Sequence, residues 1–196
     1  VLAGTLDAEK EFPTVNMEYE EAAYEATKKL IENGHSNLAF VSGPFTRDIN
    51  RLCKKVGFEK AHEEAGFTVN PEFILETDNT YDDAYNHWCE MLERDDAPTA
   101  ILVSNDELAV GILNAIRDNK FSVPDDFEII CFEHSLLARA VRPQLTSVVI
   151  PLYDLGAVSM RLLTKLMNKE ETEEDKVTLP YRFELRASTK EKNPLA

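Results

Sequence analysis

The stretch Pro98-Thr-Ala-Ile-Leu-Val-Ser-Asn-Asp-Glu-Leu-Ala-Val-Gly111 joins a strand to a helix and decides the fold class. Its apolar run, residues 100–103, has the length and composition of a strand that is buried on both faces. Ser104 and Asn105 follow as an N-cap pair, and residues 106–119 continue as a helix. A buried strand that leads into a helix is the unit from which parallel sheets are built.

The same alternation extends to both sides of this stretch. Further buried strands are predicted at residues 37–42, 73–76, 128–131 and 146–149. Amphipathic helices are predicted at residues 18–33, 51–65 and 81–94, and glycine follows the first two of them. We therefore expect an α/β fold in which a parallel sheet is flanked by helices on both faces.

The region after residue 150 has a different pattern. Residues 152–167 predict a long helix, the acidic run 170–175 predicts a solvated connection, and residues 177–179 and 181–186 predict strands. Six side chains of the helix share one face and are expected to pack on a core: Leu152, Leu155, Ser159, Leu162, Leu163 and Leu166.

A second side of the same helix, which we call the basic stripe, consists of residues spaced four apart: Tyr153, Ala157, Arg161 and Lys165. It combines one phenol, one small residue and two cations in a chain of formal net charge -15. From its spacing alone, the stripe is either a surface for an anionic group or the solubilising charge of an exposed helix.

The composition excludes several classes of function. A net charge of -15 should repel a phosphate backbone over most of the surface, so a DNA-reading part would lie elsewhere. No run of about 18 apolar residues predicts a membrane span, and residues 1–4 lack the pattern of a signal peptide. The three widely spaced cysteines predict buried thiols in a reducing cytoplasm, with neither a disulfide framework nor a zinc site.

Motifs for catalysis are lacking in the sequence. It contains no dinucleotide fingerprint, no phosphate-binding loop and no nucleophile elbow. The four histidines are scattered, and no two of them have the spacing of a helical metal pair. Asp106 and Glu107 follow a strand and are explained by the favourable interaction of carboxylates with a helix N-terminus. We expect no enzyme, no cofactor and no metal.

Several motifs, in order, resemble the lactose-repressor (LacI/GalR) family of bacterial transcription regulators. The quoted stretch is similar to the family pattern P-T-A-x-x-x-x-N-D-x-x-A-x-G, and Gly34 to Pro44 are similar to its G-H-x-x-I-A-x-x-x-G segment. Residues 123–130 and 142–148 follow in the family's order, so the resemblance covers about residues 3–190.

This resemblance implies a two-lobed core like that of periplasmic binding proteins, with DNA bound only through an N-terminal module outside these residues. It divides the chain into the end of the first lobe (1–15), the second lobe (16–149), a return helix of the first lobe (150–176), final strands of the second lobe (177–190) and a tail (191–196). It also implies a homodimer, to which residues 106–119 would contribute Leu108, Ile112 and Ala115.

The resemblance further implies a small effector bound between the lobes. The matching positions are Asn50, Lys54, Asn79, Asn105, Glu133 and Ile150. Asn105 follows a parallel strand, where open sheets place ligands, but it is equally well explained as an N-cap. Asn79 replaces a stacking aromatic ring, Glu133 and Cys131 replace Asp and Gly, and Ile150 replaces Gln. Because Lys54 keeps a cation, the pocket suits a phosphorylated sugar better than a free sugar.

One branch of the family, regulators of carbon catabolite control, resembles this chain best at residues 142–149, 152–169 and 179–182. In that branch the helix binds the seryl-phosphorylated phosphocarrier protein of the sugar phosphotransferase system. Carried over, the contacts are Tyr153, Asp154, Ala157, Arg161, Lys165 and Arg182. The alternative interpretation is the sugar-binding protein of a transporter, which an upstream signal peptide would support.

Overall fold

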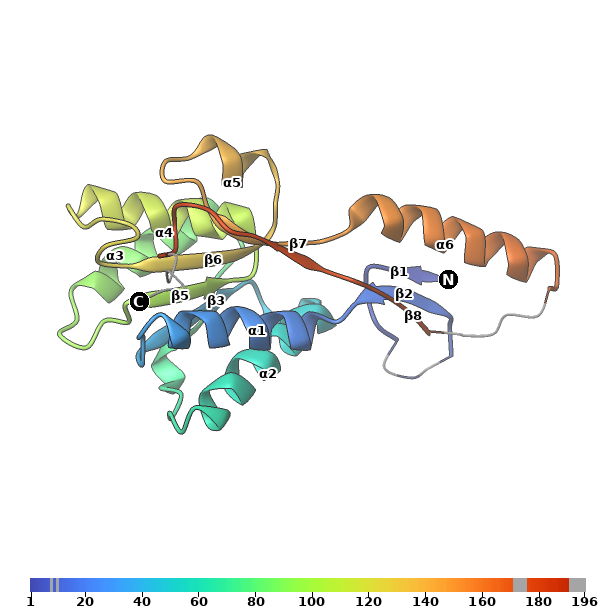
Figure 1. Cartoon of the computed structure of the whole chain (residues 1–196), viewed down its shortest axis with the longest axis horizontal. Coiled ribbons are helices and arrows are strands. Elements are labelled where there is room, and N and C mark those ends of the chain that lie inside the picture. Colours follow the sequence, from blue (N-terminus) through green and yellow to red (C-terminus); the bar gives the residue numbers. More distant parts are fainter. Residues whose placement is uncertain (8, 10, 171–175, 191–196) are drawn as a thin grey trace, which may run out of the picture.

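The computed structural model describes residues 1–7, 9, 11–170 and 176–190. Most of the acidic run (171–175) and the predicted tail (191–196) therefore lie outside the described residues. Figure 1 shows an elongated molecule with a larger body around one sheet and a smaller body that contains α6 (Leu152–Met167). The predicted α/β architecture is confirmed.

The larger body is built on a six-stranded sheet, here the large sheet, with strand order β4-β3-β5-β6-β7-β9. All neighbours are parallel except β7 and β9, which are antiparallel. The strands are β3 (Leu38–Ser42), β4 (Ile74–Glu76), β5 (Ala100–Val103), β6 (Glu128–Glu133), β7 (Thr146–Val149) and β9 (Arg182–Glu184).

Side-chain alternation along these strands divides the core into two layers. Ala39, Val41, Ile101 and Val103 pack with Trp88 under the helices α3 (Tyr81–Leu92), α4 (Asp106–Asp118) and α5 (Leu136–Ala140). On the opposite face, Leu38, Phe40 and Leu102 pack against α1 (Tyr19–Glu32) and α2 (Ile49–Glu64). Two short 3₁₀ turns, η1 (Phe45–Arg47) and η2 (Pro71–Phe73), complete this body.

The smaller body contains a three-stranded parallel sheet, here the small sheet, with order β1-β2-β8. Its strands are β1 (Leu2–Ala3), β2 (Thr14–Met17) and β8 (Lys176–Leu179). Helix α6 packs on it through Leu155, Val158, Leu162 and Leu166, which meet Val15 and Leu179. The chain passes between the two bodies after β2, after β7 and after β8, as Figure 1 shows.

Two predictions about buried faces were wrong. Leu152 and Leu163 of α6 are 67% and 37% exposed, so they do not pack on a core as expected. The cause is the narrow small sheet, which covers only one side of the helix. Leu108, Ile112 and Ala115 of α4 cannot contribute directly to a dimer surface, because all three are fully buried against the large sheet. Of the three free cysteines, only Cys131 is fully buried.

Candidate functional site

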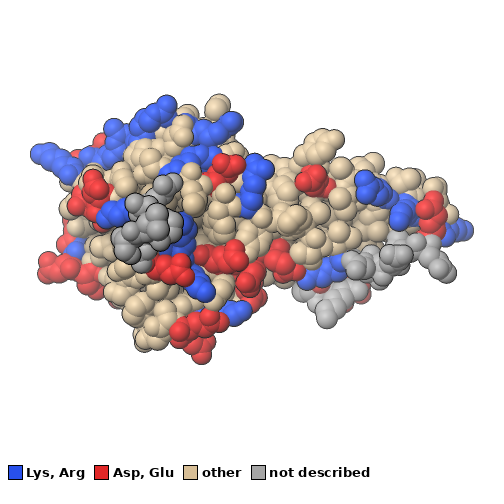
Figure 2. All heavy atoms as spheres, in the orientation of Figure 1, with Lys and Arg blue, Asp and Glu red and all other residues tan. Residues whose placement is uncertain are grey.

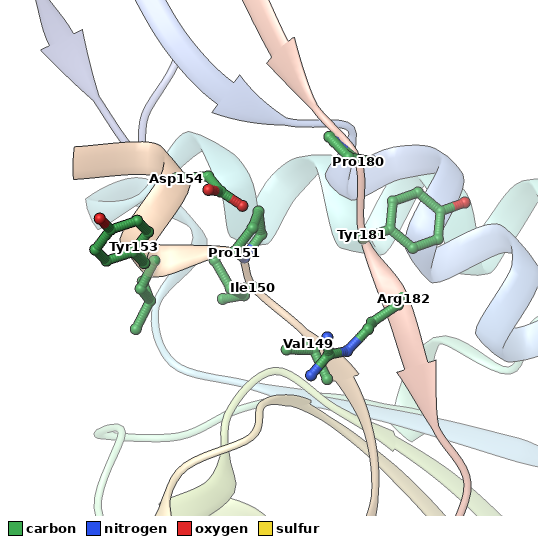
Figure 3. A pocket seen from close by; sticks show the side chains of 9 residues that line it. Val149, Ile150, Pro151, Tyr153, Asp154, Pro180, Tyr181 and Arg182 are labelled. Carbon is green, nitrogen blue, oxygen red and sulfur yellow. The ribbon is translucent and has the colours of Figure 1, made fainter. Parts of the chain in front are cut away.

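A hollow of about 410 Å³ lies where the chain crosses between the two bodies. We call it the crossover hollow, and Figure 3 shows its lining. One wall comes from the end of β7 and the start of α6, and the other comes from the segment between β8 and β9. The lining residues are Val149, Ile150, Pro151, Leu152, Tyr153, Asp154, Pro180, Tyr181 and Arg182.

The hollow brings together three of the six predicted partner contacts. Tyr153 and Asp154 stand on the first turn of α6, and Tyr153 is 87% exposed. Arg182 begins β9 and pairs in register with Val149 of β7, so its side chain comes from the large sheet. Tyr153, Asp154 and Arg182 therefore line one hollow although they come from two different bodies, and Figure 3 shows the Tyr153 ring pointing away from Arg182.

The remaining partner residues continue along α6. Ala157, Arg161 and Lys165 are all exposed, on a helix whose packed side contains Leu155, Leu162 and Leu166. Within the described part of the chain, neither Arg161 nor Lys165 forms an ion pair, whereas Arg182 lies 3.2 Å from Glu184. In Figure 2, Lys and Arg atoms lie on the part of the smaller body that Figure 1 gives to α6, with Asp and Glu atoms beside them. Exposed cations that have no ion-pair partner among the described residues suit the binding of an anion.

Four of the six predicted effector residues lie together at the carboxyl ends of the large-sheet strands: Lys54, Asn79, Asn105 and Glu133. Asn105 caps α4 by accepting from the Leu108 amide (2.9 Å), and its own amide group donates to Asn79 (2.8 Å). Lys54 of α2 donates to the carbonyl of Ser104 (2.9 Å). Burial lowers the pKa of Lys54 to about 8, although the negative charges of Glu133 and Asp48 act to raise it.

The aromatic surroundings of Lys54 explain how a buried cation is tolerated. Its ammonium lies 4.4 Å from the ring centroid of Phe132 and 5.0 Å from that of Tyr19. Glu133 ends β6 with a left-handed φ of 101°. Burial away from water raises the pKa of the Glu133 carboxyl group, and the negative charge of the nearby Asp106 raises it further. A non-glycine residue in this conformation is strained, which is common beside functional sites.

The other two predicted effector residues lie apart from this group. Ile150 lines the crossover hollow with the partner residues. Asn50, 5% exposed at the start of α2, faces the smaller body and accepts from Asn16 of β2 (2.9 Å). Asn16 was not singled out from the sequence, although a polar residue in a fully buried strand is a signal that could have identified it.

Two further properties of the described residues limit the chemistry. No group of three or more His, Cys, Asp or Glu among them is arranged to hold a metal ion. None of the helices built from them is long and apolar enough to cross a membrane.

Comparisons with known proteins point to one family. Residues 27–189 match the family model described as "Periplasmic binding protein-like domain". Catabolite control protein A of Priestia megaterium is 47% identical over 190 residues, which are 97% of this chain and 57% of that protein. The structure of the transcription regulator CcpA of Lactococcus lactis is 42% identical, with a TM-score of 0.88 over 95% of this chain and 68% of that one.

A third similar structure, 29% identical, is a LacI-family transcriptional regulator of Enterococcus faecium with bound ribose. Its TM-score is 0.82, over 90% of this chain and 65% of that one. The relatives in these comparisons are transcription regulators, and the chain spans about 57% of the length of the first of them.

Proposed function

Because this chain belongs to the family of periplasmic binding protein-like domains and matches the core of LacI-family regulators, we propose that it is the effector- and partner-binding core of a transcription regulator of carbon catabolite control. Its partner in this proposal is the seryl-phosphorylated phosphocarrier protein. DNA is bound through a separate module of the whole protein, because a net charge of -15 disfavours direct contact with a phosphate backbone.

The observation that supports the partner best is the basic stripe next to the crossover hollow. Arg161 and Lys165 are exposed, without an ion pair to any residue that the structure describes, and Arg182 stands across the hollow from Tyr153. A guanidinium binds a phosphate through charge-assisted hydrogen bonds, and the phenol of Tyr153 supplies a further donor. Titration of this chain with the carrier protein in its phosphorylated and unphosphorylated forms tests the proposal.

We further propose that the carboxyl ends of the large-sheet strands take a phosphorylated sugar, with Lys54 as the cation. Its pKa of about 8 gives this proposal a pH dependence. Below pH 8 the side chain is mostly an ammonium, and above it the neutral amine predominates. A sugar phosphate is already a dianion at pH 7, so its own charge stays the same as the pH rises further. The pH dependence of binding therefore comes from the change in the charge of Lys54.

The affinity for glucose 6-phosphate, measured by calorimetry, should fall about tenfold between pH 7 and pH 9. Glucose should show no such fall, and the variant Lys54→Met should bind glucose 6-phosphate weakly at both pH values. An affinity of the unmodified chain that stays constant across this range would show that Lys54 is not the phosphate ligand.

The homodimer also stays a proposal, with a different surface from the one predicted. Helix α5 contacts α4 and exposes two leucines, Leu136 (70%) and Leu137 (45%). Apolar side chains at this exposure are typical of a contact surface when they are adjacent. We therefore place the dimer contact at α5 instead of at the buried side chains of α4.

Leu136→Asp should convert a dimer of this chain into a monomer at micromolar concentration, as measured by sedimentation velocity. The control is Met167→Asp, since Met167 is 75% exposed at the far end of α6. A dimer that survives Leu136→Asp but dissociates in Met167→Asp would place the contact on α6. A monomeric unmodified chain would contradict the homodimer itself.

A further inference from the structure

Asn50 connects the two bodies of the molecule through both ends of its side-chain amide. Its oxygen accepts a hydrogen bond from the amide of Asn16 on β2 (2.9 Å), and its nitrogen donates to the carbonyl of Gly4 after β1 (2.7 Å). Asn50 and Asn16 are 5% and 2% exposed, so neither bond is replaced easily by water. One side chain of the larger body therefore bonds both β2 and the residue that follows β1 in the smaller body.

On the side of the larger body, Asn50 is held in place by its position on α2. Asn50 belongs to the first turn of α2, where its backbone amide donates to the side chain of the N-cap residue Asp48 (2.9 Å). Helix α2 in turn packs closely on α1, because Gly57 brings the two backbones together. A side chain on the first turn of a buried helix has little freedom to follow a movement of the other body.

The other end of the contact leads to α6. Gly4 has a left-handed φ of 74°, and a Cβ atom added there would lie 3.2 Å from Cδ2 of Leu155. Leu155 is part of the packed side of α6. A series of neighbouring residues thus connects the larger body to the helix that carries the basic stripe: Asn50, Gly4 and Leu155.

We propose that Asn50 is a positioning residue for the partner surface, which it keeps aligned across the two bodies. This inference rests on the proposed function. Arg161 and Lys165 belong to the smaller body, whereas Arg182 belongs to the large sheet. A partner can contact both groups at once only in one relative orientation of the bodies. Asn50 and Gly4 stabilise that orientation before the partner arrives, which lowers the cost of binding.

The first test measures shape in the absence of a partner. Asn50→Ala removes both hydrogen bonds, and small-angle X-ray scattering should then show a broader distribution of interatomic distances than for the unmodified chain. The matched control is Asn119→Ala, because the Asn119 amide bonds the Ala115 carbonyl of its own helix and joins no two bodies. Asn50→Asp keeps an acceptor for Asn16 but places a carboxylate against the Gly4 carbonyl, so it should open the molecule as well. Scattering of both Asn50 variants identical to that of the unmodified chain would overturn the inference.

The second test is a double-mutant cycle with the phosphorylated carrier protein. Asn50→Ala should weaken binding about three- to tenfold, because most molecules then bind the carrier through Arg161 and Lys165 without an aligned Arg182. Arg182→Ala should add little in this background, since the misaligned Arg182 no longer contributes, whereas Arg161→Ala should keep its full effect. Fully additive losses for Asn50 and Arg182 would contradict a positioning role.

The two tests separate this inference from the proposed function. If the unmodified chain does not bind the phosphorylated carrier, the proposed partner is wrong, and the scattering experiment alone then decides whether Asn50 fixes the two bodies. Thermal unfolding of each variant should show that it is folded at the temperature of measurement.

Discussion

Replacing Arg161 by alanine is expected to weaken binding of the seryl-phosphorylated carrier protein by roughly ten- to a hundredfold. A guanidinium that faces a phosphoserine forms charge-assisted hydrogen bonds, and alanine leaves that phosphate without them. Because Arg161 is exposed and forms no ion pair with another described residue, the free energy of unfolding should change by less than about 0.5 kcal/mol. Calorimetric titration and urea unfolding measure the two quantities.

Tyr153→Phe is the graded control for this prediction. It removes only the hydroxyl group of an 87% exposed ring, so the loss of affinity should be smaller than for Arg161→Ala. Binding of the unphosphorylated carrier, which we expect to be weak, should be nearly unchanged in both variants. If Arg161→Ala binds the phosphorylated carrier as tightly as the unmodified chain does, the basic stripe is solubilising charge.

A second large effect is expected at Gly57, where the backbones of α1 and α2 are in close contact. A Cβ atom at this position would lie 2.0 Å from the carbonyl oxygen of Glu20 and 2.9 Å from the amide nitrogen of Tyr24. Both are backbone atoms, so the helices would have to separate. Gly57→Ala should therefore lower the free energy of unfolding by roughly 1–3 kcal/mol or more, as measured with urea.

Gly156→Ala is the matched control, because it makes the same substitution in a helix that leaves space for it. Apart from its chain neighbours and its own helix backbone, nothing lies within 4 Å of a Cβ at Gly156, and alanine favours a helix by about 0.5–1 kcal/mol over glycine. This variant should be as stable as the unmodified chain or more stable. Equal stability of both variants would mean that α1 and α2 are not in close contact at Gly57. Since α2 carries Asn50 and Lys54, their positions depend on this contact.

The large sheet could be predicted from the sequence because most of its strands are short apolar runs, and those at residues 37–42, 73–76 and 100–103 are each followed by a predicted helix. The strand after η2 begins at Ile74 instead of residue 73, because Phe73 ends a 3₁₀ turn that Asn70 and Pro71 begin. Helix α5 was not predicted, since a helix of five residues is too short to show a periodic pattern.

The candidate site was predictable only in part. The four-residue spacing identified the basic stripe on α6, but it could not tell which apolar residues of that helix are covered. That depends on the width of the small sheet, whose strands β2 and β8 are about 160 residues apart in the sequence. Asn50 was assigned to an effector pocket by resemblance, whereas its contacts with Asn16 and Gly4 require the fold to be known.

The most direct measurement for the central claim is the affinity of this chain for the phosphocarrier protein in its two forms. Calorimetry with the seryl-phosphorylated and the unphosphorylated carrier, at the same ionic strength, isolates the contribution of one phosphate. The phosphorylated form should bind at least about tenfold more tightly, and added salt should weaken this preference. Equal affinity for the two forms would contradict the assignment of the basic stripe and the crossover hollow as a phosphoprotein-binding surface.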